Sequence, residues 1–92
     1  MIITIRHKGL DAFYHKGITK GLPQKLVKRI AIILPVLDVA EDHGDLDIPG
    51  LGLHQLKGGM RGYWAVSVSG NWRFVFRFRN KAIYDLDLVD YH

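Results

Sequence analysis

Residues 60–79 (MRGYWAVSVSGNWRFVFRFR) constrain the fold more than any other segment of the chain. On both sides of Ser69-Gly70-Asn71 the side chains alternate with a period of two, which is the period of a β-strand. Glycine and asparagine favour turns, so the segment is predicted to form an antiparallel hairpin. If Val68 pairs with Trp72, one face carries the apolar side chains that we expect in the core: Trp64, Val66, Val68, Trp72, Phe74, Phe76 and Phe78.

The other face of the predicted hairpin is mainly basic and polar. Its side chains are Arg61, Tyr63, Ala65, Ser67, Arg73, Val75, Arg77 and Arg79. This division is typical of an antiparallel sheet that is covered on one side only, so we expect the basic face to be solvated. A slip of one residue would exchange the two faces, and the pattern therefore also favours this register.

A length of 92 residues predicts one small domain spanning 1–92. The chain has no cysteine, which excludes disulfides and thiolate metal sites and suits a cytoplasmic protein. The longest apolar run, residues 30–37, is far shorter than the ~20 residues that a membrane-spanning helix needs. The N-terminus lacks the basic, apolar and small-residue regions of a signal peptide. We therefore expect a cytoplasmic protein with no membrane association.

Charge is distributed unevenly along the chain. Residues 54–81 contain six Lys and Arg and no acidic residue, whereas residues 38–53 contain five acidic residues and no Lys or Arg. A basic segment that includes the polar face of the hairpin predicts an anion-binding surface. An ordinary solvated sheet face would have the same composition, so charge alone does not decide between the two.

The chain before the hairpin is predicted to contain a strand and two helices. Residues 1–6 are rich in β-branched side chains and predict a strand, and residues 7–14 predict a helix that ends near Gly17. A longer helix begins near Pro23. We expect it to kink or restart at Pro35, because proline removes a backbone donor and disfavours helical geometry in the residue before it.

The second helix is expected to end near Asp42, with Gly44 as the stop. Its core-facing stripe consists of Leu26, Ile30, Ile33 and Leu37, while Lys25, Lys28 and Arg29 point away.

Two further strands complete the predicted fold, at residues 53–56 and 82–89. We expect the last strand to pair Arg77 with Ile83 and Arg73 with Asp87, which keeps Tyr84, Leu86 and Leu88 in the core. The order is then β-α-α-β-β-β-β, an α+β domain with two helices packed on one face of a small, largely antiparallel sheet.

Several side chains that can carry chemistry converge at one end of the basic face. Arg73 follows the hairpin turn, and the predicted last strand brings Asp90, Tyr91 and His92 to that same turn. With a loop across residues 57–62, His54 is predicted to lie opposite Ala65, on the arginine face, whereas a loop one residue different would turn it to the core face. Each of these residues alone is more simply explained by structure or by solvent exposure. Their convergence favours a functional site.

The sequence does not favour a metal site. Asp85 and Asp87 could bind Mg²⁺ together with Asp90, and His54 and His92 could bind zinc. The arginines opposite the carboxylates would repel a cation, and no close His or Cys spacing supports zinc. We expect no metal and no cofactor.

The motifs together resemble HigB-type toxins of the RelE-like toxin–antitoxin superfamily over nearly the whole length. They are His7-Lys8-Gly9-Leu10, Leu53-His54-x-Leu56-Lys57-Gly58, Gly62-Tyr63-Trp64, Asn71-Trp72-Arg73 and Asp90-Tyr91-His92.

The resemblance implies an mRNA interferase that cuts codons in the ribosomal A site. Such enzymes use the 2′-hydroxyl of the RNA as nucleophile, need no metal, and are neutralised by a helix-turn-helix antitoxin, here HigA-like. Operator DNA is bound only through that antitoxin.

The residues at hand suit this chemistry. Arg73 and Lys57 would stabilise the scissile phosphate, because a guanidinium holds two phosphate oxygens and keeps its charge. His54 and His92 are candidates for proton transfer, with base and acid unassigned. Asp90 would tune a neighbouring histidine or act as base.

RNA-binding residues complete the assignment. Tyr91 could stack on a base, and Arg61 and Arg77 of the basic face are further candidate contacts. Two other interpretations remain open: a non-catalytic RNA-binding module, and a structural partner of the antitoxin with a degenerate site.

Overall fold

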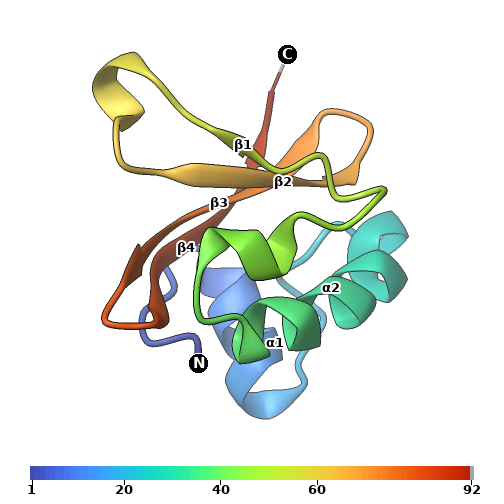
Figure 1. Ribbon diagram of the computed structural model, residues 1–92. Helices are drawn as coiled ribbons and strands as arrows, with labels where there is room; N and C mark the ends of the chain where they lie inside the picture. The colour runs from blue at the N-terminus through green and yellow to red at the C-terminus, as the bar shows by residue number, and fades with distance from the viewer. Residues whose placement is uncertain (92) are drawn as a thin grey trace.

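A four-stranded antiparallel sheet forms one layer of the molecule and two helices form the other (Figure 1). The computed structural model describes residues 1–91. The strands follow the chain in the order β1-β2-β3-β4. In order, the elements are α1 (Lys8–Lys16), α2 (Val27–Val39), β1 (His54–Gln55), β2 (Trp64–Ser69), β3 (Trp72–Arg79) and β4 (Ala82–Asp90). The predicted α+β architecture with both helices on one face is confirmed.

The prediction of an N-terminal strand is wrong. Residues 1–6 make only two isolated parallel bridges to β4, Ile2 with Ile83 and Ile5 with Leu86. Between the bridges, Asp85 has a left-handed backbone with φ of 56°, and its amide donates to the hydroxyl of Thr4 at 2.8 Å. A continuous ladder needs regular backbone on both strands, and this irregularity in β4 interrupts it.

The register of the central hairpin is confirmed over most of its length. Trp64 pairs with Phe76 and Val66 with Phe74. Close to the turn the register shifts, and Trp72 pairs with Ser69 instead of Val68. The core prediction holds fully for Val66, Val68, Phe74 and Phe76, which are buried.

Trp64, Trp72 and Phe78 are only half-buried at the margin of that core. His43, in a 3-10 turn at His43–Leu46, stacks on the Trp64 ring with centroids 4.3 Å apart. The rest of the core consists mainly of aliphatic residues from the helices and β4.

The predicted pairing of β3 with β4 is wrong in detail. Arg77 pairs with Tyr84 and Arg73 pairs with Val89. The ladder shifts between Val75 and Arg77, opposite the irregular backbone at Asp85. Because of the shift, the core takes a different set of side chains: Leu86 and Leu88 are buried as predicted, Ile83 is buried as well, and Tyr84 is only half-buried.

Helix α1 ends as predicted, with Gly17 in the left-handed conformation as its cap. Helix α2 departs from the prediction in two ways. It continues through Pro35 without a break and ends at Val39. Pro35 lies on the exposed side, where water can bind the backbone carbonyl that loses its partner. The carboxylate of Asp42 caps the following 3-10 turn by accepting from the Asp45 amide, and Gly44 lies inside that turn.

The buried stripe is confirmed: Leu26, just before α2, and Ile30, Ile33 and Leu37 within it are fully buried. Lys25, Lys28 and Arg29 are exposed, but the prediction that all three point away is wrong for Arg29, whose Nε donates to the Val68 carbonyl of β2 at 3.1 Å. The helix therefore closes one side of the core and leaves the opposite face of the sheet to the basic residues.

Candidate functional site

His54 lies on β1, opposite Ala65 of β2, as the sequence predicted. The side chain is exposed, and its Nδ1 lies 3.0 Å from the carbonyl oxygen of Gly52. A carbonyl oxygen only accepts, so this contact requires the proton on Nδ1. Nε2 is then the ring nitrogen that can take a proton from a substrate.

Arg73 lies on the same face of the sheet, opposite Ser67 on β2. Its Nη1 donates to the carbonyl oxygens of Gly70 at 2.6 Å and Trp72 at 3.0 Å. These two bonds fix the guanidinium against the hairpin turn. The second edge, formed by Nε and Nη2, has the geometry to bind two oxygens of one phosphate.

Strand pairing places His54 and Arg73 on neighbouring parts of one sheet face. They stand two strands apart and are offset by two residues, since Ala65 pairs with His54 on one side and with Val75 on the other. Strand spacing and rise give a separation of roughly 12 Å between their Cα atoms. A single nucleotide bound on this face is long enough to bridge such a gap between two long side chains.

The sheet face between His54 and Arg73 is less exposed to solvent than predicted. Ala65 and Val75 are buried although they lie on the basic side. Tyr63, Arg73 and Arg77 beside them are half-buried, because long polar side chains cover apolar neighbours with their stems. The prediction of a fully solvated face is therefore wrong at its centre and right at its rim.

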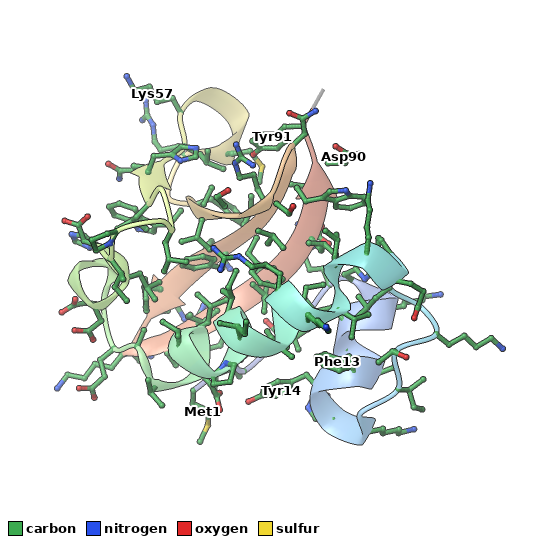
Figure 2. The ribbon with its side chains drawn as sticks, turned by 90° about the vertical axis from the view of Figure 1, so that its right-hand side faces the viewer. Met1, Phe13, Tyr14, Lys57, Asp90 and Tyr91 are labelled. Carbon is green, nitrogen blue, oxygen red and sulfur yellow. The ribbon has the colours of Figure 1, made fainter. Side chains whose placement is uncertain are left out.

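The end of the chain reaches the hairpin turn, as predicted. Asp90 pairs with Trp72, and the Tyr91 amide donates to the Asn71 carbonyl at 2.9 Å. Figure 2 shows Asp90 and Tyr91 beside each other at the same end of the molecule as Lys57. Asp90 also takes part in a polar or electrostatic interaction, so it is not a free residue. The predicted role of His92 lies outside the described residues.

Lys57 and Arg61 line one cavity of about 400 Å³ with Gln55, Leu56 and Gly58. Both cations are exposed, and they flank the short 3-10 turn Gly58–Met60 that follows β1. Two cations at the rim of an open cavity favour an anionic ligand such as an RNA backbone. The structure thus places these two predicted RNA contacts together.

Arg77 is placed differently from Arg73. Its Nη2 lies 2.7 Å from the Asp85 carboxylate, and its guanidinium sits over the Tyr63 ring at 5.5 Å. It stands four residues along β3 from Arg73, which is roughly 13 Å in an extended strand. The positive charge is thereby neutralised locally, and the structure does not bring Arg77 together with the other candidates.

Sequence reasoning missed a second cavity at the hairpin turn. It has a volume of about 310 Å³ and is lined by Lys25, Leu26, Ser69, Gly70, Asn71, Trp72 and Asp90. Lys25 comes from the short helical turn Gln24–Leu26 before α2. No sequence pattern relates Lys25 to the hairpin turn, because only packing of the helical layer against the sheet brings them together.

Among residues 1–91, no three His, Asp or Glu side chains form a cluster that could hold a metal ion. Asp85 is paired with Arg77, and the Asp87 carboxylate accepts from the Leu88 amide. In the same part of the chain no helix is long and apolar enough to cross a membrane.

Comparison with known proteins gives a consistent result. A family model described as RelE-like toxin of type II toxin-antitoxin system HigB matches residues 3–92. The chain is 42% identical over 92 residues to Endoribonuclease HigB of Proteus vulgaris, covering 100% of both sequences.

Solved structures share the fold at low sequence identity. A chain of the YoeB-YefM complex from Staphylococcus aureus matches with a TM-score of 0.64 and 20% identity, covering 100% of this chain and 98% of that one. The YoeB/ParE toxin from Agrobacterium tumefaciens matches with a TM-score of 0.53 and 20% identity, covering 100% and 99%. Two helices beside a four-stranded antiparallel sheet are thus a RelE- and YoeB-like arrangement.

Proposed function

Because this chain belongs to the HigB family of RelE-like toxins from type II toxin–antitoxin systems, we propose that it is an endoribonuclease that cleaves mRNA codons in the ribosomal A site. One observation carries the proposal: His54 and Arg73, each within a motif of the family resemblance, lie on one face of the sheet beside the chain end. The full-length relationship to an endoribonuclease supports it further.

The reaction is a transesterification within the RNA. The 2′-hydroxyl loses its proton to a base and attacks the adjacent phosphorus, and the bond from phosphorus to the 5′-oxygen breaks. That oxygen gains a proton from an acid. The products are a 2′,3′-cyclic phosphate and a 5′-hydroxyl, with no water consumed and no metal required.

Arg73 is assigned to the phosphate. The phosphorane in the transition state gathers negative charge, and a guanidinium already fixed by the main chain can bind it without reorganisation. Lys57 adds a second positive charge from the end of β1.

Proton transfer is assigned to His54 and His92, with base and acid not distinguished. Nδ1 of His54 is bonded to the Gly52 carbonyl oxygen, so Nε2 is the ring nitrogen that exchanges the proton. Asp90 either tunes a neighbouring histidine or serves as base.

Substrate binding is assigned to the residues around this centre. Tyr91 would stack on a base, and Arg61 with Lys57 would hold backbone phosphates. We give Arg77 a structural role instead, because Asp85 and Tyr63 already occupy its charged group.

The ribosome is the proposed partner in catalysis. The site is an open face with exposed His54 and Lys57, so a scaffold that orients the mRNA would supply much of the rate enhancement. The proposed setting is the cytoplasm, with a HigA-like helix-turn-helix antitoxin that also links the toxin to operator DNA.

The chemistry of the cut ends tests the mechanism. Cleavage of a translated message by purified protein and ribosomes should give a 5′-hydroxyl and a cyclic phosphate, in frame with the codons. Removal of the start codon should abolish the cuts. A 5′-phosphate product would contradict 2′-hydroxyl attack, and binding of mRNA without cleavage would favour the non-catalytic RNA-binding module.

A further inference from the structure

Helix α2 carries exposed apolar side chains on its outward side after its first turn. Ile32 is 62% exposed and Val39 is 77% exposed, and the neighbouring Ala31 and Pro35 are also exposed. Spacings of three and four residues place these side chains on one stripe of the helix. Lys28 lies on the same side one turn earlier, so the apolar patch begins after the first turn of α2. A contiguous exposed apolar patch with a polar rim is typical of an interaction surface.

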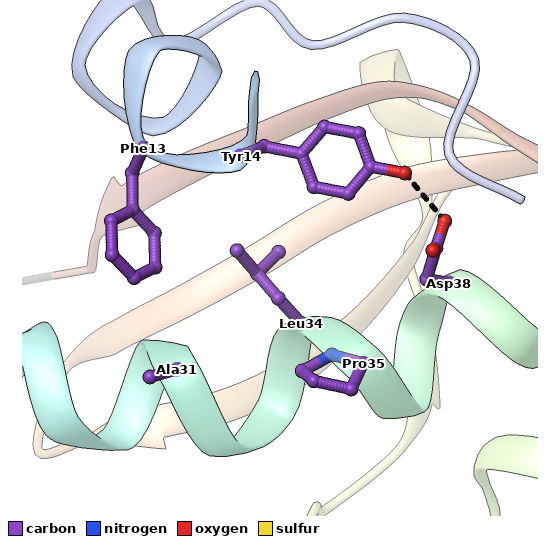
Figure 3. Close-up of a pocket in the computed structure, with 6 residues that line it drawn as sticks. All are labelled: Phe13, Tyr14, Ala31, Leu34, Pro35 and Asp38. Atoms are coloured by element: carbon purple, nitrogen blue, oxygen red, sulfur yellow. Dashed lines mark hydrogen bonds between the residues drawn. The ribbon is translucent and has the colours of Figure 1, made fainter. Parts of the chain in front are cut away.

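A groove of about 250 Å³ runs beside this stripe, between α1 and α2. Figure 3 shows Phe13 and Tyr14 of α1 facing Leu34 and Pro35 of α2 across it. Its walls are largely apolar, and Asp38 provides the polar end. The groove and the outward stripe share Ala31 and Pro35, so they form one continuous surface, here called the α2 surface.

The polar end of the groove is held rigidly. The Tyr14 hydroxyl donates to Asp38 Oδ1 at 2.6 Å, and the Ile2 amide donates to the same oxygen at 2.9 Å. Burial and the neighbouring carboxylate raise the pKa of Tyr14 to about 12, so the hydroxyl stays protonated and bonded. A groove fixed in this way exists before any partner binds, which lowers the entropic cost of binding.

We propose that the α2 surface binds an amphipathic helix of the cognate antitoxin. Membership of a type II toxin–antitoxin family supplies the partner, and the proposal rests on that membership and not on the assigned catalytic residues. Thirteen residues give α2 a length of roughly 20 Å. A strip of that length is narrow for a stable dimer, which buries ~800 Å² per partner, but it suits a helix laid in a groove.

Charge specifies the orientation of that helix. Lys28 is exposed in the first turn of α2, and Glu41 and Asp42 are exposed just beyond its C-terminal end. The antitoxin helix should therefore carry apolar side chains three to four residues apart, an acidic residue opposite Lys28 and basic residues opposite Glu41 and Asp42.

The α2 surface is separate from the candidate RNA site. Figure 2 shows Phe13 and Tyr14 at the opposite end of the molecule from Lys57, Asp90 and Tyr91. Substitutions on one surface therefore leave the other intact, and antitoxin binding can be tested without loss of toxicity.

The test is the double substitution Ile32→Glu with Val39→Glu, in the full chain. Titration calorimetry with the purified antitoxin should show affinity at least about 100-fold weaker, since two central anchors are replaced by charges. Without antitoxin, growth arrest should match the parent protein, and antitoxin co-expression should no longer rescue growth. Lys81→Glu in the β3–β4 turn is the matched control, because it changes the net charge by the same amount away from α2.

A second measurement uses the absence of cysteine from this chain. Val39→Cys introduces a unique thiol, and excess antitoxin should slow its alkylation at least tenfold while leaving that of Lys81→Cys unchanged. Affinity of the double variant within about threefold of the parent, or unprotected Cys at 39, would overturn the proposal. Sedimentation that shows a dimer broken by the double substitution, with antitoxin affinity unchanged, would assign the surface to a second copy. If the unsubstituted protein does not arrest growth, that result contradicts the proposed RNA cleavage and leaves the antitoxin-binding proposal to the affinity measurements.

Discussion

Arg73 and Arg77 lie on the same face of the same strand, yet their surroundings give them different uses. The carbonyl oxygens of Gly70 in the hairpin turn and of Trp72 hold Arg73 by one nitrogen, and within residues 1–91 no carboxylate forms an ion pair with it, so a second edge can meet a phosphate. A carboxylate and an aromatic ring hold Arg77. The comparison teaches that residue type and sheet face do not identify an anion site. The partner of each cation decides whether its charge can act on a substrate.

The largest effect is expected at the chain end beside Arg73. Removal of His92 takes away one proposed proton-transfer group and leaves the apolar residues of β4 intact. Ribosome-dependent cleavage should fall roughly 100- to 10,000-fold. The thermal midpoint and antitoxin affinity should stay unchanged, as calorimetry can check. Full toxicity of the folded, truncated protein would place the proton-transfer groups elsewhere.

The two arginines can be compared directly by the same substitution. Arg73→Lys keeps the charge but loses two-pronged binding, so the cleavage rate should drop about 100-fold or more. Arg77→Lys should change the rate less than about threefold. Single-turnover cleavage of one codon on purified ribosomes measures both. Equal losses in the two variants would remove the distinction between the arginines.

Breaking the ion pair of Arg77 should affect stability and not catalysis. Asp85→Asn keeps the shape of the side chain and suits the left-handed backbone at this position. The pair is partly exposed, so the free energy of unfolding should fall by only about 0.5–1 kcal/mol. Urea titration measures this loss, and the cleavage rate is the control. A large fall in rate would show that Asp85 or Arg77 serves the reaction.

A stability effect of similar size is expected on the helical side, where the Tyr14 hydroxyl is bonded to Asp38. Tyr14→Phe removes one hydrogen bond and should lower stability by about 1 kcal/mol at neutral pH.

The pH dependence of that loss has a definite sign. The pKa of Tyr14 is raised from 10.0 to about 12, so its contribution is complete below pH 10 and is lost as pH rises through 12. The pKa of Asp38 is lowered from 3.8 by the Tyr14 bond, so its contribution is lost as pH falls below that value. Urea titrations of both proteins should therefore differ most between about pH 5 and 9. A difference that is constant to pH 12 would contradict the bond.

Local periodicity determined much of this protein from the sequence alone. Alternation in residues 60–79 predicted the hairpin and the buried Phe74 and Phe76. These features depend on the period of two in a strand, which neighbouring residues specify by themselves. Whether His54 would face the arginines or the core depended on the length of the loop at residues 57–62, and the structure places it opposite Ala65 on the arginine face.

Tertiary structure decided the rest. The register of β4 depends on the irregular backbone at Asp85, whose amide bonds the hydroxyl of Thr4. Those residues are far apart in sequence, so no local pattern records the contact. Likewise, only the packed helices show that Lys25 reaches the hairpin turn and that Ile32 and Val39 face outward. A pattern in sequence specifies which faces exist, and long-range packing decides what covers each face and which charges remain able to act.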